Sequence, residues 1–131
     1  MVVAVNQGKN CMFSAEERKA MMERLLKEYT NVEVTLWDRL VVEFAIKYDA
    51  KVMVRGVRAL ADFGYEFELA MTNRGLEPDI EIMFMPTDPK YFVLRSSAIK
   101  EIAFYDGDIS TMVPPEVAVA LKQKLRSGEG S

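Results

Sequence analysis

The feature that most constrains the fold is a short apolar run, residues 51–54, that ends at two closely spaced arginines. The run is β-branched and apolar, which is typical of a strand buried on both faces. Arg55 and Arg58 follow it directly, before a helical pattern begins. An open α/β sheet places anionic ligands at such strand ends, so the pattern indicates a ligand site. The alternative, that both arginines cap a sheet edge and face solvent, stays open on the pattern alone.

The segment after the arginines predicts a helix. Its apolar side chains recur at every fourth residue, which places Phe63, Phe67 and Met71 on one side of a helix. Asp62 is a candidate N-cap, and Gly75 is a candidate for the first residue beyond the helix.

Strand and helix signals alternate along the rest of the chain. Apolar or alternating segments at residues 2–5, 32–36, 51–54 and 80–84 predict strands, and helical spacing separates them. Ser14, Asp38 and Pro115 are typical of helix starts. The predicted order is β-α-β-α-β-α-β-α-α. This order indicates an α/β fold, a Rossmann-like parallel sheet with helices on both faces.

Length and composition exclude several classes of protein. With 131 residues the chain fits one domain, expected over residues 1–125, followed by a flexible tail at residues 126–131. A net charge of −3 argues against a nucleic-acid or membrane-surface protein, and no apolar run is long enough to span a bilayer. A single cysteine favours a reducing compartment, and hence the cytoplasm. Because histidine is absent, histidine bases and histidine metal ligands are excluded.

Cationic residues follow several of the predicted strands. By the rule that ligands bind at the carboxyl ends of parallel strands, one edge of the sheet would gather Lys9, Arg55, Arg58 and Arg95. The hydroxyls of Ser96 and Ser97 stand at a predicted helix start, where free N–H groups suit phosphate oxygens. The pattern favours a phosphate-rich ligand. An exposed loop lysine at position 9 and an ordinary serine N-cap are the alternatives.

Three motifs carry a resemblance to a known family. They are NQGKNCMFSAEER, VRGVRALADFGYEFELAMTNR, and LRSSAIKEIA followed by GDISTMVPPEV. With these motifs, the chain from Val2 to Leu125 resembles the bacterial phosphopantetheine adenylyltransferases of the nucleotidyltransferase superfamily. The resemblance implies a nucleotidyltransferase fold and a cytoplasmic enzyme of coenzyme A biosynthesis. Such an enzyme transfers an adenylyl group from ATP to 4′-phosphopantetheine with Mg²⁺, and the family forms a homo-oligomer, a hexamer.

The same resemblance implies roles for individual residues. Lys9 and Arg55 match the positions that hold the phosphate of phosphopantetheine and the reacting phosphates, and Val41 matches a contact to the pantetheine arm. The ATP-binding positions match Gly56, Val57, Arg58 and Glu66. A second ATP-binding segment matches Tyr91, Phe92, Val93, Leu94, Arg95, Ser96 and Ser97, with the two serines near the distal phosphates. No protein metal ligand is implied.

The implied chemistry suits the residue types in this chain. Attack of a phosphate on the α-phosphorus of ATP needs no covalent intermediate and little proton transfer. Catalysis then depends on positioning and on neutralising charge by Lys, Arg, a helix N-terminus and Mg²⁺. A protein without Cys–His or Ser–His pairs can do this chemistry.

The resemblance lacks one part of the family pattern. Family members begin with a strand, a Gly-x-Phe-x-Pro loop, a Thr/His-x-Gly-His motif and a helix, and the histidine there stabilises the transition state. This first β-α unit, about thirty residues, is missing here, and its strand would be central to the sheet. Three explanations stay open: a fragment or start-site truncation, a split enzyme completed by another chain, or a shortened paralogue.

Two other functions remain as alternatives. One is a catalytically inactive module that binds nucleotide or coenzyme A, or that assembles with partners. The other is a related cytidylyltransferase, which the segment ADFGYE disfavours.

Overall fold

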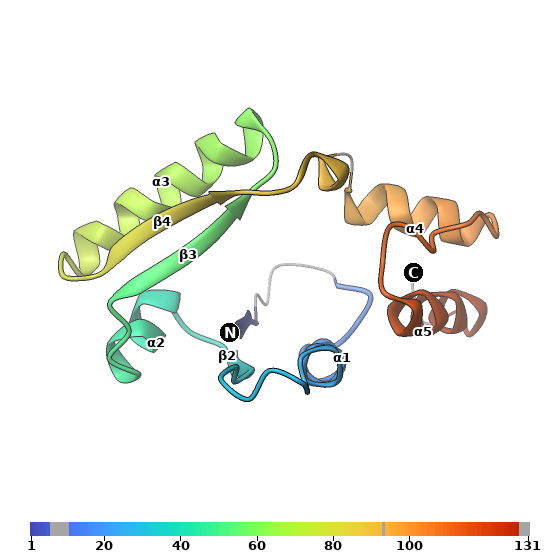
Figure 1. Ribbon diagram of the computed structural model, residues 1–131, viewed down its shortest axis with the longest axis horizontal. Coiled ribbons are helices and arrows are strands. Elements are labelled where there is room, and N and C mark those ends of the chain that lie inside the picture. Colours follow the sequence, from blue (N-terminus) through green and yellow to red (C-terminus); the bar gives the residue numbers. More distant parts are fainter. Residues whose placement is uncertain (6–10, 93, 129–131) are drawn as a thin grey trace. The chain divides into compact units, whose positions relative to one another are not determined.

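The computed structural model describes residues 1–5, 11–92 and 94–128, in two compact units. Unit 1 comprises Met1–Asp38 and Leu94–Ser131, and unit 2 comprises Arg39–Val93. Figure 1 labels most of the helices and strands of both. The single domain over residues 1–125 and the flexible tail stay predictions.

The described part of unit 1 contains one pair of parallel strands and three helices. Strand β1 (Val2–Ala4) pairs with β2 (Thr35–Trp37), with Val3 opposite Leu36. Helix α1 (Ala15–Leu25) contacts both strands. Helices α4 (Ser96–Phe104) and α5 (Pro115–Arg126) contact each other.

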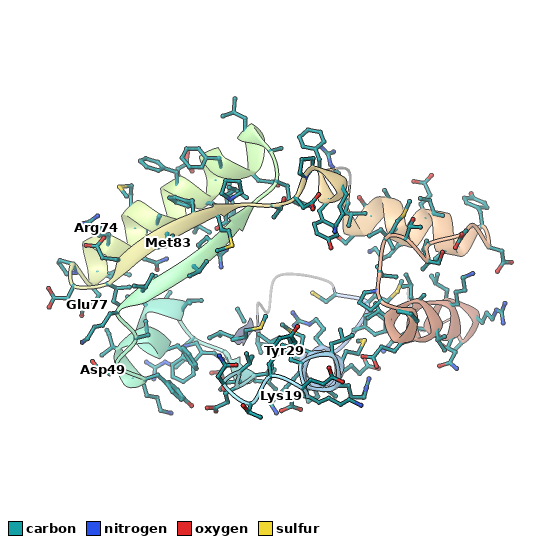
Figure 2. The ribbon with its side chains drawn as sticks, viewed as in Figure 1. Lys19, Tyr29, Asp49, Arg74, Glu77 and Met83 are labelled. Atoms are coloured by element: carbon teal, nitrogen blue, oxygen red, sulfur yellow. The ribbon has the colours of Figure 1, made fainter. Side chains whose placement is uncertain are left out.

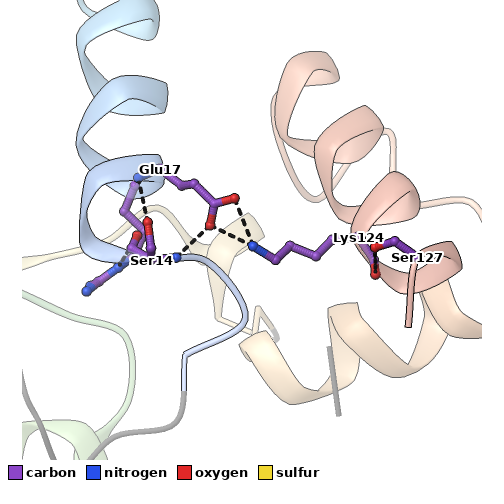
Figure 3. A network of polar contacts seen from close by, with 5 residues as sticks. Ser14, Glu17, Lys124 and Ser127 are labelled. Carbon is purple, nitrogen blue, oxygen red and sulfur yellow. Dashed lines mark hydrogen bonds and ion pairs between the residues drawn. The ribbon is translucent and has the colours of Figure 1, made fainter. Parts of the chain in front are cut away.

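The start of α1 is fixed by a capping box. Glu17 N–H donates to Ser14 Oγ at 3.1 Å, and Ser14 N–H donates to Glu17 Oε2 at 2.6 Å. Lys124 of α5 donates to both Glu17 carboxylate oxygens at 2.8 Å (Figure 3). The Lys124 hydrogen bond and the Ser14 N–H lower the pKa of Glu17 below its ordinary value of 4.5. The Ser14 cap predicted from the sequence is confirmed, and it also links α1 to α5.

A buried cluster joins α4, the following loop and α5. Ala103, Ile109 and Leu121 are nearly inaccessible, and Met12 and Phe13 pack against them. These side chains come from segments far apart in the sequence, so the cluster holds the helical part of unit 1 together.

Helix α4 ends in a Schellman motif. Asp106 adopts the left-handed conformation with φ 57°. Its N–H donates to Ala103 O at 3.2 Å, and Gly107 N–H donates to Ile102 O at 2.8 Å. These two bonds satisfy carbonyl groups in the last turn of α4, which ends at Phe104.

Unit 2 begins with helix α2 (Val41–Lys47) and contains strands β3 (Val52–Val57) and β4 (Glu81–Pro86). The strands are parallel, with Arg55 opposite Phe84. Helix α3 (Leu60–Leu76) connects them, and the 3₁₀ helix η1 (Pro89–Tyr91) follows β4. Val42 and Ala45 of α2 pack on Ile80, which immediately precedes β4.

Helix α3 covers one face of the β3–β4 pair (Figure 1). Phe63 and Phe67 of α3 pack on Phe84 of β4, with ring centroids 5.1 and 6.5 Å apart. Because side chains alternate along strands, the other face carries a second apolar set. These side chains are 45–55% exposed, and they are Val52, Val54, Met83 (labelled in Figure 2) and Met85.

The predicted fold class is confirmed. Strands and helices occur in the predicted order, both strand pairs are parallel, and each β-α-β connection contains a helix. In the described part of the chain, the strands form two sheets of two, β1–β2 and β3–β4, rather than the one sheet predicted.

Several predicted boundaries are wrong. Arg55 and Gly56 belong to β3 instead of following it, because β3 stays paired with β4 as far as Val57 and Pro86. Helix α3 starts after Ala59, so Asp62 is not its cap, and it continues through Gly75 to Leu76.

Two further boundaries differ near the middle of unit 1 and at the start of unit 2. A strand is expected at residues 32–36, but the strand found there, β2, covers Thr35–Trp37, where it pairs with β1. Helix α2 is preceded by Leu40 without a side-chain cap, so Asp38 does not cap it. Within the described ranges, no helix has the length and apolar character needed to cross a bilayer.

Candidate functional site

A cavity of about 310 Å³ opens in unit 2 where β3 passes into α3. Its lining residues are Gly56, Arg58, Asp62, Tyr65 and Glu66. Gly56 comes from the strand and Arg58 from the short connection, whereas the other three come from the first turns of the helix. The cavity therefore lies at the carboxyl end of a parallel strand, where α/β sheets bind ligands.

Arg55 is held at this end of the strand by Glu66 of α3. Arg55 Nε donates to Glu66 Oε2 at 2.7 Å, and Nη2 donates to Oε1 at 2.9 Å. The Glu66 side chain is 17% exposed and the Arg55 side chain 44% exposed. A bidentate pair of this kind fixes the plane of the guanidinium. Glu66 accepts from two of the five N–H donors of Arg55, so other N–H groups of this guanidinium remain for further acceptors.

Arg58 is held in a similar way by Asp62. Arg58 Nε donates to Asp62 Oδ2 at 3.0 Å, and Nη2 donates to Oδ1 at a longer 3.4 Å. Asp62 and Glu66 are four residues apart on α3 and so lie on one face of the helix. Arg58, Asp62 and Glu66 therefore line the cavity, and Arg55, which does not line it, is bound to Glu66.

The local sequence explains this placement. Arg55 alternates with Val54 along β3, which turns its side chain toward the α3 face. Gly56 has no side chain, and a Cβ there would meet only Thr87 at an ordinary 3.8 Å. The backbone at the cavity wall is therefore accessible because of the missing side chain and not because of a special backbone conformation.

The remaining predicted residues of unit 2 lie around this region or on neighbouring elements. Val57 ends β3 and is partly buried, and Val41 is the first residue of α2 and also partly buried. Tyr91 ends η1, Phe92 follows it, and both are exposed. None of these four lines the cavity of about 310 Å³.

The predicted serine segment belongs to unit 1. Helix α4 begins at Ser96, and Ser97 lies in its first turn, as the sequence predicts. Arg95 occupies the cap position in an extended conformation without a side-chain cap bond, so the alternative of a serine N-cap is wrong. Leu94 precedes it and is partly buried. Lys9 and Val93 lie outside the described residues.

Two of the cavity residues, Asp62 and Tyr65, are not among the ligand residues predicted from the sequence. Asp62 was interpreted as a helix cap. A signal for its true partner exists in the sequence, because Arg58 and Asp62 have the i, i+4 spacing of ion pairs along a helix. Tyr65 has no comparable signal, since an aromatic residue at its position is equally typical of a packed helix face.

The carboxylates of the cavity do not form a metal site of their own. Asp62 and Glu66 each bind an arginine, and among the described residues no group of three or more Asp, Glu, Cys or His side chains is placed to hold a metal ion. Chemically, the cavity offers guanidinium donors and an open backbone segment, which suit phosphate oxygens.

Comparisons with known proteins agree with this chemistry. Residues 1–102 match the cytidylyltransferase-like family. A phosphopantetheine adenylyltransferase of Nitrosomonas eutropha is 45% identical over 132 residues, covering 98% of this chain and 80% of the relative. One from Clostridium perfringens is 40% identical, covering 99% and 80%. Another from Clostridium botulinum is 39% identical over 125 residues, covering 95% and 76%.

Proposed function

The chain belongs to the phosphopantetheine adenylyltransferase family, and we propose that it transfers the adenylyl group of ATP to 4′-phosphopantetheine. The products are dephospho-coenzyme A and pyrophosphate. The observation that carries the proposal for this chain is the pair of oriented arginines at the end of β3, beside an open glycine backbone.

The reaction is a displacement at phosphorus. A phosphate oxygen of phosphopantetheine forms a bond to the α-phosphorus, and the bond from that phosphorus to the α,β-bridging oxygen breaks. Pyrophosphate leaves with the electron pair. Negative charge is crowded on the phosphates throughout, so fixed cations lower the barrier more than any general base would.

We assign Arg55 to the reacting phosphates, with Lys9 as a second cation. The Glu66 carboxylate fixes the Arg55 guanidinium before the substrates arrive, which reduces the ordering that binding requires. Glu66 therefore contributes to ATP binding in two ways: it orients Arg55, and it forms part of the cavity wall. Val41 is assigned to the pantetheine arm, because a partly buried apolar side chain suits an uncharged segment.

We assign ATP to the cavity at Gly56, Val57 and Arg58, and to the segment from Tyr91 to Ser97. The exposed Ser96 and Ser97 stand at the start of α4, where unpaired helical N–H groups attract phosphate. Mg²⁺ would enter with ATP, bound by phosphate oxygens and water, since such sites usually leave this ion most of its waters.

Assembly and location complete the proposal. We propose a homo-oligomer, a hexamer as the family resemblance implies, acting in the cytoplasm, where a single unpaired cysteine is stable. Light scattering during size-exclusion chromatography measures the mass of the assembly. A monomeric mass, together with a turnover rate per chain that does not depend on protein concentration, would contradict the assembly.

The deciding experiment measures pyrophosphate release from ATP, 4′-phosphopantetheine and Mg²⁺. We expect turnover that requires all three, and we expect Arg55→Ala to reduce kcat/KM by about 10²–10³-fold or more. Arg74→Ala is the matched control, because Arg74 lies near the far end of α3 and pairs only loosely with Glu81 at 3.6 Å (Figure 2). It should retain wild-type turnover.

Three other results would redirect the assignment. An Arg55→Ala enzyme as active as wild type would refute the role of Arg55. Faster release from CTP than from ATP would indicate a cytidylyltransferase. Tight ATP binding without turnover would support the inactive binding module.

A further inference from the structure

Asp62 forms a contact that no helix-capping role explains. Helix α3 starts at Leu60 after Ala59, which has no side-chain cap bond, and the Asp62 carboxylate instead accepts from Arg58 Nε and Nη2. Both residues line the same cavity. The Arg58 side chain is 38% exposed and the Asp62 side chain is 35% exposed, so a ligand that enters this cavity can reach the pair.

The pair resembles the neighbouring pair of Arg55 and Glu66 in its geometry. In each, a carboxylate from α3 accepts from Nε and Nη2 of an arginine at the end of β3. An arginine side chain has several rotatable bonds, and a bidentate carboxylate restricts the position of its guanidinium. A surface pair that served only stability would contribute little in this exposed setting.

We propose that Asp62 is a positioning residue that orients the Arg58 guanidinium toward the polyphosphate of ATP. This inference rests on the proposed function, because it names how one cation of that site is oriented. Asp62 acts through Arg58 and makes no contact with the reacting atoms.

The direction in which a substitution of Asp62 changes ATP affinity separates this positioning role from a purely electrostatic one. If Asp62 were only a negative charge near the cavity, Asp62→Ala or Asp62→Asn would remove a repulsion and tighten ATP binding. If Asp62 orients Arg58, the same changes remove the bidentate restraint on the guanidinium, and ATP binding should weaken by about threefold to tenfold. Asn keeps one acceptor oxygen, so its loss should be smaller than that of Ala. Asp62→Glu keeps the carboxylate and should restore part of the affinity.

The experiment measures the dissociation constant of ATP by calorimetry, and KM for each substrate where turnover is present. We expect a higher dissociation constant and a higher KM for ATP, with KM for phosphopantetheine changed less than twofold. Glu81→Gln is the matched control. It removes the carboxylate partner of Arg74, and Glu81 lies at the first residue of β4, at the end of the strand pair away from the cavity. It should bind ATP as the wild type does.

A double-mutant cycle with Arg58→Ala tests whether Asp62 acts through Arg58. In the Arg58→Ala background, Asp62→Ala should have little further effect on ATP binding. Full additivity of the two changes would overturn the proposal, as would tighter ATP binding by Asp62→Ala.

A spectroscopic readout makes the inference independent of turnover. The Arg58 Nε–H signal in ¹H–¹⁵N spectra should be sharp in the wild type and Glu81→Gln, and broadened or lost in Asp62→Ala. If the wild type bound no ATP, the proposed function would fail, and the ligand role of Asp62 would fail with it. An Arg58 signal unchanged by Asp62→Ala would overturn the positioning itself, whatever the ligand.

Discussion

The loop after α4 offers a sharp test of packing, because Gly107 lies against the end of the helix. A Cβ built at Gly107 would come within 2.5 Å of Ile102 Cγ2 and 2.9 Å of Ile102 O. The first contact could be relieved by a change of rotamer, but the second involves backbone. The chain around Gly107 must therefore shift, and the Gly107 N–H bond to Ile102 O at 2.8 Å would weaken.

The expected cost of Gly107→Ala follows from these contacts. Overpacking costs about 1–3 kcal/mol, and weakening one hydrogen bond costs about 0.5–1.5 kcal/mol. Replacing glycine returns about 0.4–1 kcal/mol by restricting the unfolded chain. The net loss in the free energy of unfolding should be about 2 kcal/mol.

Gly64→Ala is the matched control, because the chemical change is the same and the surroundings differ. Gly64 lies inside α3 with nothing within 4 Å of an added Cβ, so alanine should stabilise the helix by about 0.5–1 kcal/mol. Urea unfolding measures both variants, with circular dichroism for the whole chain and the fluorescence of Trp37 for unit 1. A Gly107→Ala protein within 0.5 kcal/mol of wild type would refute the close approach at Ile102.

Two further substitutions test the contacts within each unit. Glu17→Gln should destabilise the protein at neutral pH, because the folded pKa of Glu17 is lowered and its contribution exists above the ordinary value of 4.5. That contribution is lost as pH falls through the lowered pKa, so urea unfolding of the two proteins should converge in acid, and a difference that grows there would contradict the assignment to Lys124. Phe84→Ala should lower the free energy of unfolding by about 2–3 kcal/mol, because Phe63 and Phe67 lose their partner on β4. Phe84→Leu should lose less, and equal losses would show that ring packing contributes nothing specific.

Much of the fold could be predicted because the signals are local. The capping box at Ser14 needs only residues three apart, and the proline start of α5 needs only one residue. The alternation of strand and helix patterns was enough to give the α/β class, since each pattern reflects side-chain periodicity.

The site was predictable only in part. Arg55 and Arg58 could be found because they follow an apolar strand pattern, but the pattern does not say which acids they meet. The bond from Arg55 to Glu66 spans eleven residues and depends on how α3 packs on β3. The roles of Lys9 and of the segment from Tyr91 to Ser97 stay predictions.

The sequence by itself determined the order of the strands and helices and the arginine-rich strand end, because both depend on neighbours along the chain. The tertiary structure decided where β3 ends, since its pairing with β4 keeps Arg55 and Gly56 within the strand. It also decided that Asp62 binds Arg58 instead of capping a helix. Strand pairing and side-chain contacts of this kind depend on surfaces that come together only when the chain folds.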